Sequence, residues 1–493
     1  MTKSPAKNYF PKNLFTILFF CFLAVSLGSC SGGGGGGGGG GVGGELYSIS
    51  GTVTSGSSGL SGVTMTLTGT SSATTTTGSN GIYQFSNLAA GSYTITPSKT
   101  GYTFSPSSRS VSISTANITG QGFTATVTWA KTFGDLYDDM AHSAQQTSDG
   151  GYIVAGETSS LGAGSADFWM LKLTAYGEID WQQTYGGIND DLAKSIRQTS
   201  DGGYIVAGQS SSLGNVLGDI WILKLKSTGV IDWQYSAGGT GSSIANAIQE
   251  ISGGGFIVAG ETYSPGTRSA DVWVLKLDDT GNPLSGWPKT FDGGGRDAAY
   301  SIQQTSDGYI VAGETYSALT GSTDAWILKL DANGTIVWQK TFGGANYDIA
   351  YSIQDTTDGY IVAGETSSSG AGSADAWVFK LDSSGNLQSG WPKTYGGTYR
   401  DAARFIQQTS DDGFIVAGET YSYGAGDADA WILKLDASGT VVWQKTFGGA
   451  NYDIASSIQQ TTDGGYIVAG ETSSSGAGYA DFWILKIDEN GNI

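Results

Sequence analysis

A segment of 51 to 54 residues recurs seven times between Trp129 and the C-terminus, and this recurrence limits the possible folds more than any other feature. Each copy contains four short runs of the form W-Q-K-T-F, S-I-Q-Q-T, Y-I-V-A-G-E-T and D-x-W-I-L-K-L, rich in residues that favour strands. Gly, Asp and Ser, which favour turns, separate the runs. Four strands in a repeat of this length are typical of a β-propeller blade, and a β-solenoid is the alternative. The copies begin at Trp129, Trp181, Trp233, Trp287, Trp338, Trp391 and Trp443.

The two ends of the array predict how it closes. The array opens with the run at Trp129 and ends after Asp481-x-Trp483 without a further run of the W-Q-K-T-F kind. The last blade would lack its fourth strand unless residues 128–133 supply it, and that pairing would remove two free sheet edges. We therefore expect residues 128–493 to form a seven-bladed β-propeller with four strands per blade. No stretch has a helical apolar period, so the fold is expected to be all-β.

The repeats resemble the bacterial SBBP and delta-60 propeller repeats. The segment K-L-D-A-N-G-T-I-V-W-Q also resembles the tryptophan-docking motif of quinoprotein propellers. The resemblance implies that the S-I-Q-Q-T strands lie next to the propeller axis and that the W-Q-K-T-F strands lie outermost. The residues of a quinoprotein cofactor site cannot be placed in this sequence, so we expect no cofactor.

Residues 46–124 have a different pattern. Apolar and polar residues alternate in short runs such as 47–53 and 63–67, which predicts a small antiparallel β-sandwich. The pattern G-x-Y-x-F-x-x-L-x-x-G-x-Y at 81–93 resembles carboxypeptidase regulatory-like domains, a transthyretin-like and Cna-B-like group. The resemblance implies a spacer, or a module that contacts glycans. The segment has no Asp or Glu, and Lys99 is its only lysine, so the isopeptide bond of some Cna-B domains is excluded.

The N-terminus predicts export and lipid anchoring. Residues 1–29 combine three lysines with a short apolar run, as a signal peptide does. The run ends in L-G-S-C, which resembles the bacterial lipobox and implies cleavage before Cys30 and attachment of acyl chains such as palmitate to that cysteine. Ser31 follows, and by the sorting rule of enteric bacteria this favours the outer membrane. Residues 30–45 carry the lipid and a polyglycine tether. We expect a cell-envelope lipoprotein exposed on the outer membrane or cell surface.

The cysteine count excludes an internal disulfide, and the net charge argues against one class of partner. Cys21 and Cys30 are the only cysteines, so the mature chain has no internal disulfide. The formal net charge is −20, which opposes binding to phosphate backbones, and no nucleic-acid partner is expected.

Two sets of repeated residues look like functional groups but fit a structural role better. A tryptophan at a fixed strand position in every blade is what packing between blades requires. An aspartate at a strand entry commonly accepts backbone hydrogen bonds in a turn; a ring of carboxylates that binds Ca²⁺ is the alternative, and we expect no metal. The tryptophans of D-x-W are Trp169, Trp221, Trp273, Trp326, Trp377, Trp431 and Trp483.

No catalytic constellation is found. The Glu of A-G-E-T and the Lys of L-K-L recur in nearly every copy. An enzyme needs its catalytic carboxylates at one site only, so this recurrence indicates a structural ion pair between strands. His142 is the only histidine and aligns with variable residues, so we expect it to face solvent. We expect no enzyme activity.

Specificity should lie where the copies differ, and four arginines are the candidate ligand contacts: Arg268, Arg296, Arg400 and Arg404. The sequence thus predicts a non-catalytic binding or scaffold protein of the cell envelope, with a protein or carbohydrate ligand. A propeller-based glycan hydrolase or lyase, or an outer-membrane assembly factor, is the alternative.

Overall fold

The computed structural model describes residues 44–214, 216–239, 241–263, 269–317 and 321–493. These residues form strands, turns and loops without any helix, and none of them forms a helix able to cross a membrane. The segment Glu45–Ile493 is one compact unit, distinct from Met1–Gly44. The expected signal peptide, Cys30 and most of the expected tether lie outside the described residues.

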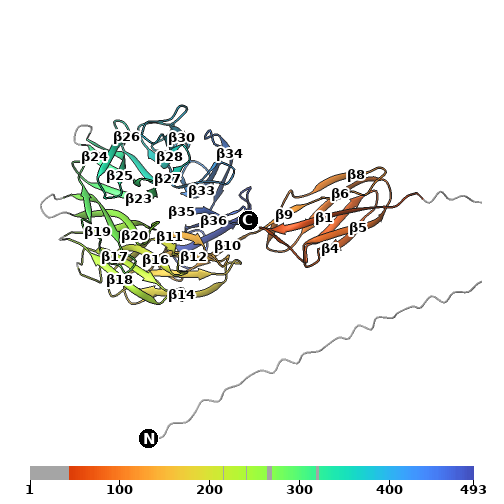
Figure 1. Ribbon diagram of the computed structural model, residues 1–493, viewed down its shortest axis with the longest axis horizontal. Helices are drawn as coiled ribbons and strands as arrows, with labels where there is room; N and C mark the ends of the chain where they lie inside the picture. The colour runs from red at the N-terminus through yellow and green to blue at the C-terminus, as the bar shows by residue number, and fades with distance from the viewer. Residues whose placement is uncertain (1–43, 215, 240, 264–268, 318–320) are drawn as a thin grey trace, which may run out of the picture. The chain divides into compact units, whose positions relative to one another are not determined.

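The N-terminal strands form a β-sandwich, as predicted, but β1 and β9 pair in parallel, so the sandwich is not wholly antiparallel (Figure 1). One sheet has the order β2-β1-β9-β7, with β5 also paired to β1, and the other has the order β4-β3-β6-β8. Ile49 and Val53 of β1 pack on Met65 and Leu67 of β3 in the core. The sandwich extends to Val127, slightly beyond the predicted end at Thr124, because β9 pairs with both β1 and β7. The strands are β1 (Tyr47–Ser55), β2 (Ser58–Gly59), β3 (Thr64–Gly69), β4 (Ala73–Thr76), β5 (Ile82–Leu88), β6 (Gly91–Ser98), β7 (Tyr102–Ser105), β8 (Arg109–Ile113) and β9 (Phe123–Val127).

The repeats form seven antiparallel four-stranded sheets within the described residues. The S-I-Q-Q-T runs give the first strands: β11 (Asp139–Gln146), β15 (Asp191–Gln198), β19 (Ser243–Glu250), β23 (Asp297–Thr305), β27 (Asp348–Thr356), β31 (Asp401–Gln408) and β35 (Asp453–Gln460). The Y-I-V-A-G-E-T runs give the second strands: β12 (Tyr152–Thr158), β16 (Tyr204–Ser210), β20 (Phe256–Tyr263), β24 (Gly308–Ser317), β28 (Gly359–Thr366), β32 (Phe414–Thr420) and β36 (Tyr466–Thr472).

The remaining two runs complete each sheet. The D-x-W-I-L-K-L runs give the third strands: β13 (Asp167–Leu173), β17 (Asp219–Leu225), β21 (Ala270–Leu277), β25 (Ser322–Asp331), β29 (Asp375–Leu381), β33 (Asp429–Leu435) and β37 (Asp481–Ile487). The runs that start at the other tryptophans give the fourth strands: β10 (Trp129–Phe133), β14 (Ile179–Tyr185), β18 (Ile231–Ala237), β22 (Lys289–Phe291), β26 (Ile336–Phe342), β30 (Lys393–Tyr395) and β34 (Val441–Phe447). Strands β22 and β30 are short because Pro288 and Pro392, just before them, have no N–H to donate.

The first strand of the array pairs with the last. β10 lies antiparallel to β37, with Trp129 opposite Lys486 and Phe133 opposite Phe482, and the sheet order is β10-β37-β36-β35. The sequence prediction that residues 128–133 complete the last sheet is therefore confirmed. In Figure 1 the blue strands β35 and β36 lie beside β11 and β12, and β11 contacts both β35 and β36.

Neighbouring sheets pack through both sets of tryptophans. The Trp169 ring, from β13, lies 4.5 Å from the Phe482 ring of β37 and shares a core with Ile484. Trp129 of β10 stands edge-on to Tyr152 of β12 at 5.8 Å, and its indole N–H donates to the carbonyl of Ala175. Of the seven D-x-W tryptophans, only Trp483 is half-buried, and the other six are buried.

Candidate functional site

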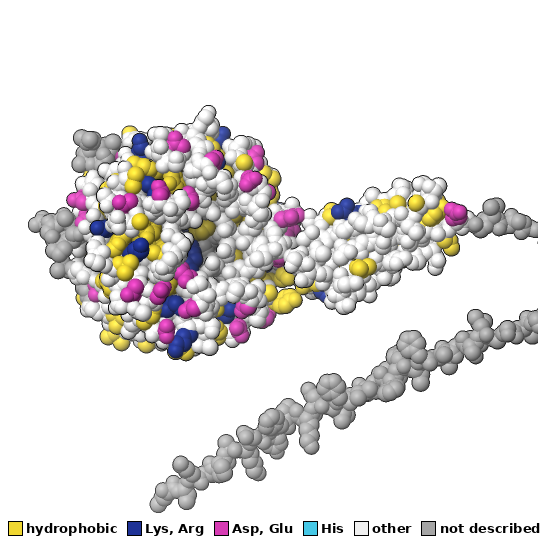
Figure 2. Space-filling model, viewed as in Figure 1, with side chains coloured by type: hydrophobic (Ala, Val, Ile, Leu, Met, Phe, Trp, Pro, Cys, Tyr) yellow, Lys and Arg dark blue, Asp and Glu magenta, His cyan; other side chains and the backbone are white. Residues whose placement is uncertain are grey.

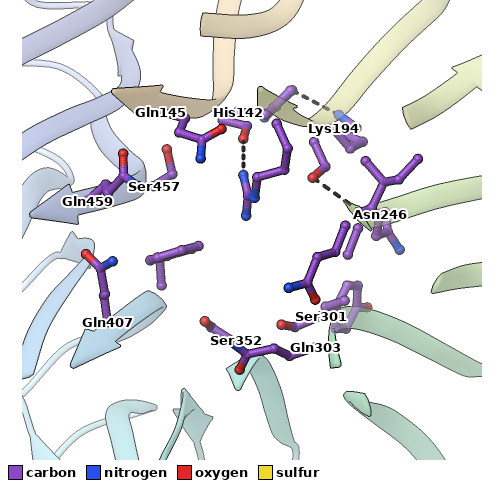
Figure 3. Close-up of a pocket in the computed structure, with 18 of the residues that line it drawn as sticks. His142, Gln145, Lys194, Asn246, Ser301, Gln303, Ser352, Gln407, Ser457 and Gln459 are labelled. Carbon is purple, nitrogen blue, oxygen red and sulfur yellow. Dashed lines mark hydrogen bonds between the residues drawn. The ribbon is translucent and has the colours of Figure 1, made fainter. Parts of the chain in front are cut away.

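The first strands of all seven sheets line one cavity of about 490 Å³. Figure 3 shows side chains from these strands, among them His142, Asn246 and Gln407, arranged around a shared opening. Figure 2 shows the array hollowed between its sheets, with charged side chains around the hollow. The lining is mainly Ser, Gln and other polar side chains, which suits a hydrated ligand better than an apolar one.

The repeated Ser and Gln of this lining hold the sheets together. Their side-chain oxygens accept hydrogen bonds from backbone N–H groups of the first strand in the neighbouring sheet. These N–H groups have no backbone acceptor there, because the two first strands are not hydrogen-bonded to each other as a β-ladder. The serine bonds measure 3.1–3.4 Å and the glutamine bonds 2.5–2.9 Å. Ala247, Phe405 and Arg197 interrupt the pattern. These Ser and Gln residues are framework, although they face the cavity.

A β-bulge lies at the same position of every first strand. The pairing of β11 with β12 shifts at His142, and the equivalent shift recurs in the six other sheets. The Gly of A-G-E-T makes room for it: a Cβ at Gly156 would lie 1.9 Å from the carbonyl oxygen of Met140, and the equivalent distances are 1.8–2.0 Å. A bulge redirects a side chain, and here it turns one residue per sheet toward the cavity.

The bulge positions vary from copy to copy, whereas the Ser, Ile and Gln positions that follow them are mostly repeated. The seven residues are half-buried, line the cavity and are of six kinds. We call them the bulge ring: His142, Lys194, Asn246, Tyr300, Tyr351, Arg404 and Ser456. Sequence reasoning missed this ring apart from Arg404. The available signal was the variable residue before S-I-Q-Q-T in each copy.

In four copies the Glu of A-G-E-T pairs with a bulge-ring residue. Tyr300 and Tyr351 donate hydrogen bonds of 2.8 and 3.1 Å to Glu314 and Glu365. The predicted Glu–Lys pair is therefore wrong. The Lys of L-K-L instead binds the Asp of the turn between the first and second strands, as in Lys172–Asp149 at 2.9 Å. The same pairing recurs at Lys224–Asp201, Lys329–Asp307, Lys380–Asp358, Lys434–Asp411 and Lys486–Asp463.

His142 does not face solvent, contrary to the sequence prediction. Its Nε2 lies 2.9 Å from Nζ of Lys194 and 3.3 Å from Oε2 of Glu157. Burial, followed by the charge of Lys194, lowers the pKa of His142, so the ring is neutral at pH 7. Burial alone would raise the pKa of Glu157, but its bonds to His142 and Lys194 lower it to about 2. This side of the bulge ring is thus a neutral imidazole between a cation and a carboxylate.

Another part of the bulge ring consists of two tyrosines and an arginine. The rings of Tyr300 and Tyr351 are 5.5 Å apart, and the Arg404 guanidinium lies 5.7 Å from the centre of the Tyr351 ring. Arg404 also pairs with Glu419 at 3.0 Å. Burial raises the pKa of both tyrosines, so their hydroxyls stay protonated at neutral pH. Two aromatic faces and a guanidinium therefore border the cavity.

The other predicted arginines lie elsewhere. Arg268 lies outside the described residues. Arg296 bridges Glu261 and Glu314, and Arg400 bridges Glu365 and Glu419, so each joins two neighbouring sheets. Of the three predicted ligand-contact arginines that the structure describes, only Arg404 lines the cavity.

The repeated aspartates cap turns, as predicted. Asp167, at the start of β13, accepts a hydrogen bond of 2.7 Å from the backbone N–H of Ala163. Asp191, at the start of β15, accepts one of 2.8 Å from Gly187. Equivalent bonds recur at Asp375, Asp429, Asp481, Asp297, Asp348, Asp401 and Asp453.

A comparison with protein families supports the sandwich. Residues 45–127 match the family described as BOS complex subunit NOMO1-like, second beta sandwich domain, which is a transthyretin-like fold and covers the predicted sandwich. No curated protein matches the chain significantly.

Three solved structures are similar to this chain, each at 12% identity. Sqt1 from Chaetomium thermophilum has a TM-score of 0.41, with 70% of this chain and 83% of that chain covered. The extracellular domain of a hybrid two-component system from B. thetaiotaomicron has a TM-score of 0.40, with 72% and 42% covered. Puromycin hydrolase has a TM-score of 0.43, with 71% and 52% covered.

Proposed function

We propose that this protein is an exported, lipid-anchored binding protein that holds its ligand at the bulge ring. The observation that carries the proposal is the convergence on one cavity of seven residues of six kinds, between strand positions that are mostly repeated. Varied side chains that face one cavity are what ligand recognition requires.

We infer that the seven sheets close into a seven-bladed β-propeller. Three observations support closure. β10 completes the sheet of β35–β37, the backbone of β11 bonds to Ser457 and Gln459 of β35, and the first strands of all seven sheets line the same cavity. A closed ring would hold the bulge ring in a fixed geometry, which lowers the entropic cost of binding.

A carbohydrate is the ligand that the bulge ring suits best. Sugar rings have apolar faces that stack on aromatic side chains and hydroxyls that bond to polar ones. Tyr300 and Tyr351 offer the aromatic faces, and Asn246, Lys194 and Arg404 offer donors around the same cavity. A protein side chain inserted into the cavity is the competing ligand.

The test is a glycan array probed with the compact unit from Glu45 to Ile493, followed by calorimetry on any hit. Tyr351→Ala should weaken binding at least about tenfold, whereas Tyr351→Phe, which keeps the ring, should bind nearly as the wild type does. The change leaves Glu365 paired with Arg400. Tyr399→Ala is the matched control, because Tyr399 is 64% exposed and does not line the cavity. Equal binding by wild type and Tyr351→Ala would exclude the bulge ring as the site.

A glycan hydrolase is the second candidate, and one observation favours it. Burial and the charge of Glu157 raise the pKa of Glu471, whereas the pKa of Glu157 itself is lowered to about 2. Carboxyl groups with separated pKa values are the usual acid and base of glycoside hydrolysis. Neither Glu lines the cavity, however, which favours binding without turnover. Release of reducing ends from any polysaccharide, abolished by Glu471→Gln, would establish the enzyme instead.

The anchor is tested separately. Cells fed a clickable palmitate analogue should label the wild-type protein and not Cys30→Ser, and the variant should leave the membrane fraction. Labelling of Cys30→Ser would contradict lipid attachment at that residue. Surface protease treatment of intact cells would then show whether the protein faces outward.

A further inference from the structure

One copy of the repeat places an acid where the other six have glycine. The residue after the fourth strand is Gly in six copies, and a Cβ there would lie 1.8–2.4 Å from the Oδ1 atom of the aspartate that starts the third strand. At Gly186, for example, the carboxylates of Asp167 and Asp191 approach from two neighbouring sheets. The fourth copy has Asp292 at this position. The six glycines are Gly134, Gly186, Gly238, Gly343, Gly396 and Gly448.

Asp292 turns a pair of facing carboxylates into a group of three. Asp271 of β21, Asp292 and Asp297 of β23 each present a carboxylate oxygen, and these three oxygens lie within 4.8 Å of one another. Asp271 is 3% exposed and Asp297 is 0% exposed. The Oδ1 atom of Asp271 has no hydrogen-bond partner among the described residues. A buried carboxylate oxygen without a partner is costly, and a third carboxylate beside it adds repulsion, so a bound cation would stabilise this arrangement.

The described side chains around the group do not supply that cation. Arg296, the neighbour of Asp297, has its guanidinium bonded to Glu261 and Glu314. Thr315, which lies opposite Asp297 across the sheet, places a buried hydroxyl beside the Asp297 carboxyl but no positive charge.

We propose that Asp271, Asp292 and Asp297 bind one Ca²⁺ ion between the sheet of β19–β22 and the sheet of β23–β26. Ca²⁺ takes several oxygen ligands in flexible geometry, and two oxygens on opposite sides of the ion lie about 5 Å apart, which the group allows. The Thr315 hydroxyl can supply a fourth oxygen, and Asp292 is exposed, which leaves room for water ligands. Mg²⁺ demands a stricter octahedron and is rarely held by protein carboxylates alone. The proposal departs, for this one copy, from the expectation that the repeated aspartates bind no metal.

The site is tested with CaCl₂ alone on the compact unit from Glu45 to Ile493, by thermal unfolding and by calorimetry. The wild type should bind one ion with a Kd on the order of 0.1–1 mM, as extracellular calcium modules do, and its unfolding temperature should rise. NaCl at matched ionic strength and MgCl₂ are the salt controls. Neither should reproduce the rise.

Asp292→Gly is the matched variant, because it restores the residue that the other six copies carry. It should lose the calcium response. In EDTA it should unfold at a higher temperature than the wild type, because one of three facing carboxylates is gone. Asp292→Asn, which keeps the side-chain size, should also lose the response. A wild type that ignores CaCl₂, or an Asp292→Gly variant that responds as the wild type does, would overturn the proposal.

Discussion

The backbone N–H of Ala144, in β11, donates a hydrogen bond of 3.1 Å to Oγ of Ser457, in β35, although 313 residues separate them. Two residues further along the same strands, Gln146 N–H donates to Oε1 of Gln459 at 2.7 Å. The same two bonds join consecutive sheets elsewhere, for example through Ser352 and Gln354. The residues that link each sheet to the next therefore also link the last sheet to the first.

Ser457→Ala should destabilise the array by about 1–2 kcal/mol. The substitution leaves the buried N–H of Ala144 without its acceptor, and an unmet buried donor costs that much. The free energy of unfolding in urea measures the loss. Ser456→Ala is the control, since its position in the bulge ring calls for no such bond and the free energy of unfolding should barely change. Equal effects from both variants would mean that the Ala144–Ser457 bond contributes nothing.

Trp129→Ala should cost more, about 3–5 kcal/mol, which is typical of removing a buried aromatic side chain. Trp129 is 8% exposed, packs on Tyr152 and donates its indole N–H to Ala175 at 3.0 Å. It holds β10 against the rest of the array at the point where the first and last strands meet. Urea unfolding should show the loss, and Trp129→Phe should recover part of it. An unchanged free energy of unfolding would show that β10 does not stabilise the array.

The repeated features could be predicted from the sequence because each appears seven times. Short runs of strand-favouring residues, separated by turn residues, predicted the four strands, and the missing final run predicted the pairing of β10 with β37. The packing role of Trp169 and its equivalents followed from their recurrence.

The bulge ring could not be predicted in this way. A bulge is a backbone register shift at residues such as His142 and Tyr300, and alternating side-chain patterns contain no sign of it. His142 was therefore expected to face solvent, and its place beside Glu157 depends on that shift.

The predicted Glu–Lys pair is wrong because the two strands run in opposite directions. Glu157 comes late in β12 and Lys172 comes late in β13, and antiparallel strands place those ends at opposite ends of the sheet. Lys172 is opposite Ile153, whereas Glu157 is opposite Phe168. Membership of neighbouring strands does not make two residues neighbours.

Asp463→Asn should destabilise the protein by about 3 kcal/mol, because it leaves a buried cation without its counter-charge. Lys486 is 0% exposed, and its Nζ lies 3.0 Å from Oδ1 of Asp463. Adding Lys486→Met should restore most of the free energy of unfolding. The third copy has Gly253 in place of this aspartate, and its lysine, Lys276, is half-buried rather than buried. If the double variant is no more stable than Asp463→Asn alone, loss of the Lys486–Asp463 ion pair is not the cause of the destabilisation.

Glu471→Gln should stabilise the protein at pH 7, with a rise in unfolding temperature of about 1–2 °C. The bulge residue of its sheet is Ser456, which is too short to pair with Glu471 as Tyr351 pairs with Glu365. Burial, with the charges of Glu157 and Glu419, raises the pKa of Glu471. A carboxyl with a raised folded pKa loses stability as the pH rises from its ordinary pKa through the folded value. The advantage of Glu471→Gln should therefore be present at pH 7 and disappear in acid.

Glu157→Gln should destabilise the protein at pH 7, the opposite of Glu471→Gln. Comparing the two variants tests whether contacts with the bulge-ring residues set the pKa of each glutamate. Bonds to His142 and Lys194 hold the pKa of Glu157 at about 2, so its stabilising effect is complete above the ordinary carboxyl pKa and is lost as the pH falls toward 2. Glu157→Gln should thus lower the unfolding temperature at pH 7, and the loss should shrink in acid. Thermal unfolding between pH 3 and pH 7 measures both slopes. If the two variants shifted with pH in the same direction, the contacts of the bulge ring would not control these carboxylates.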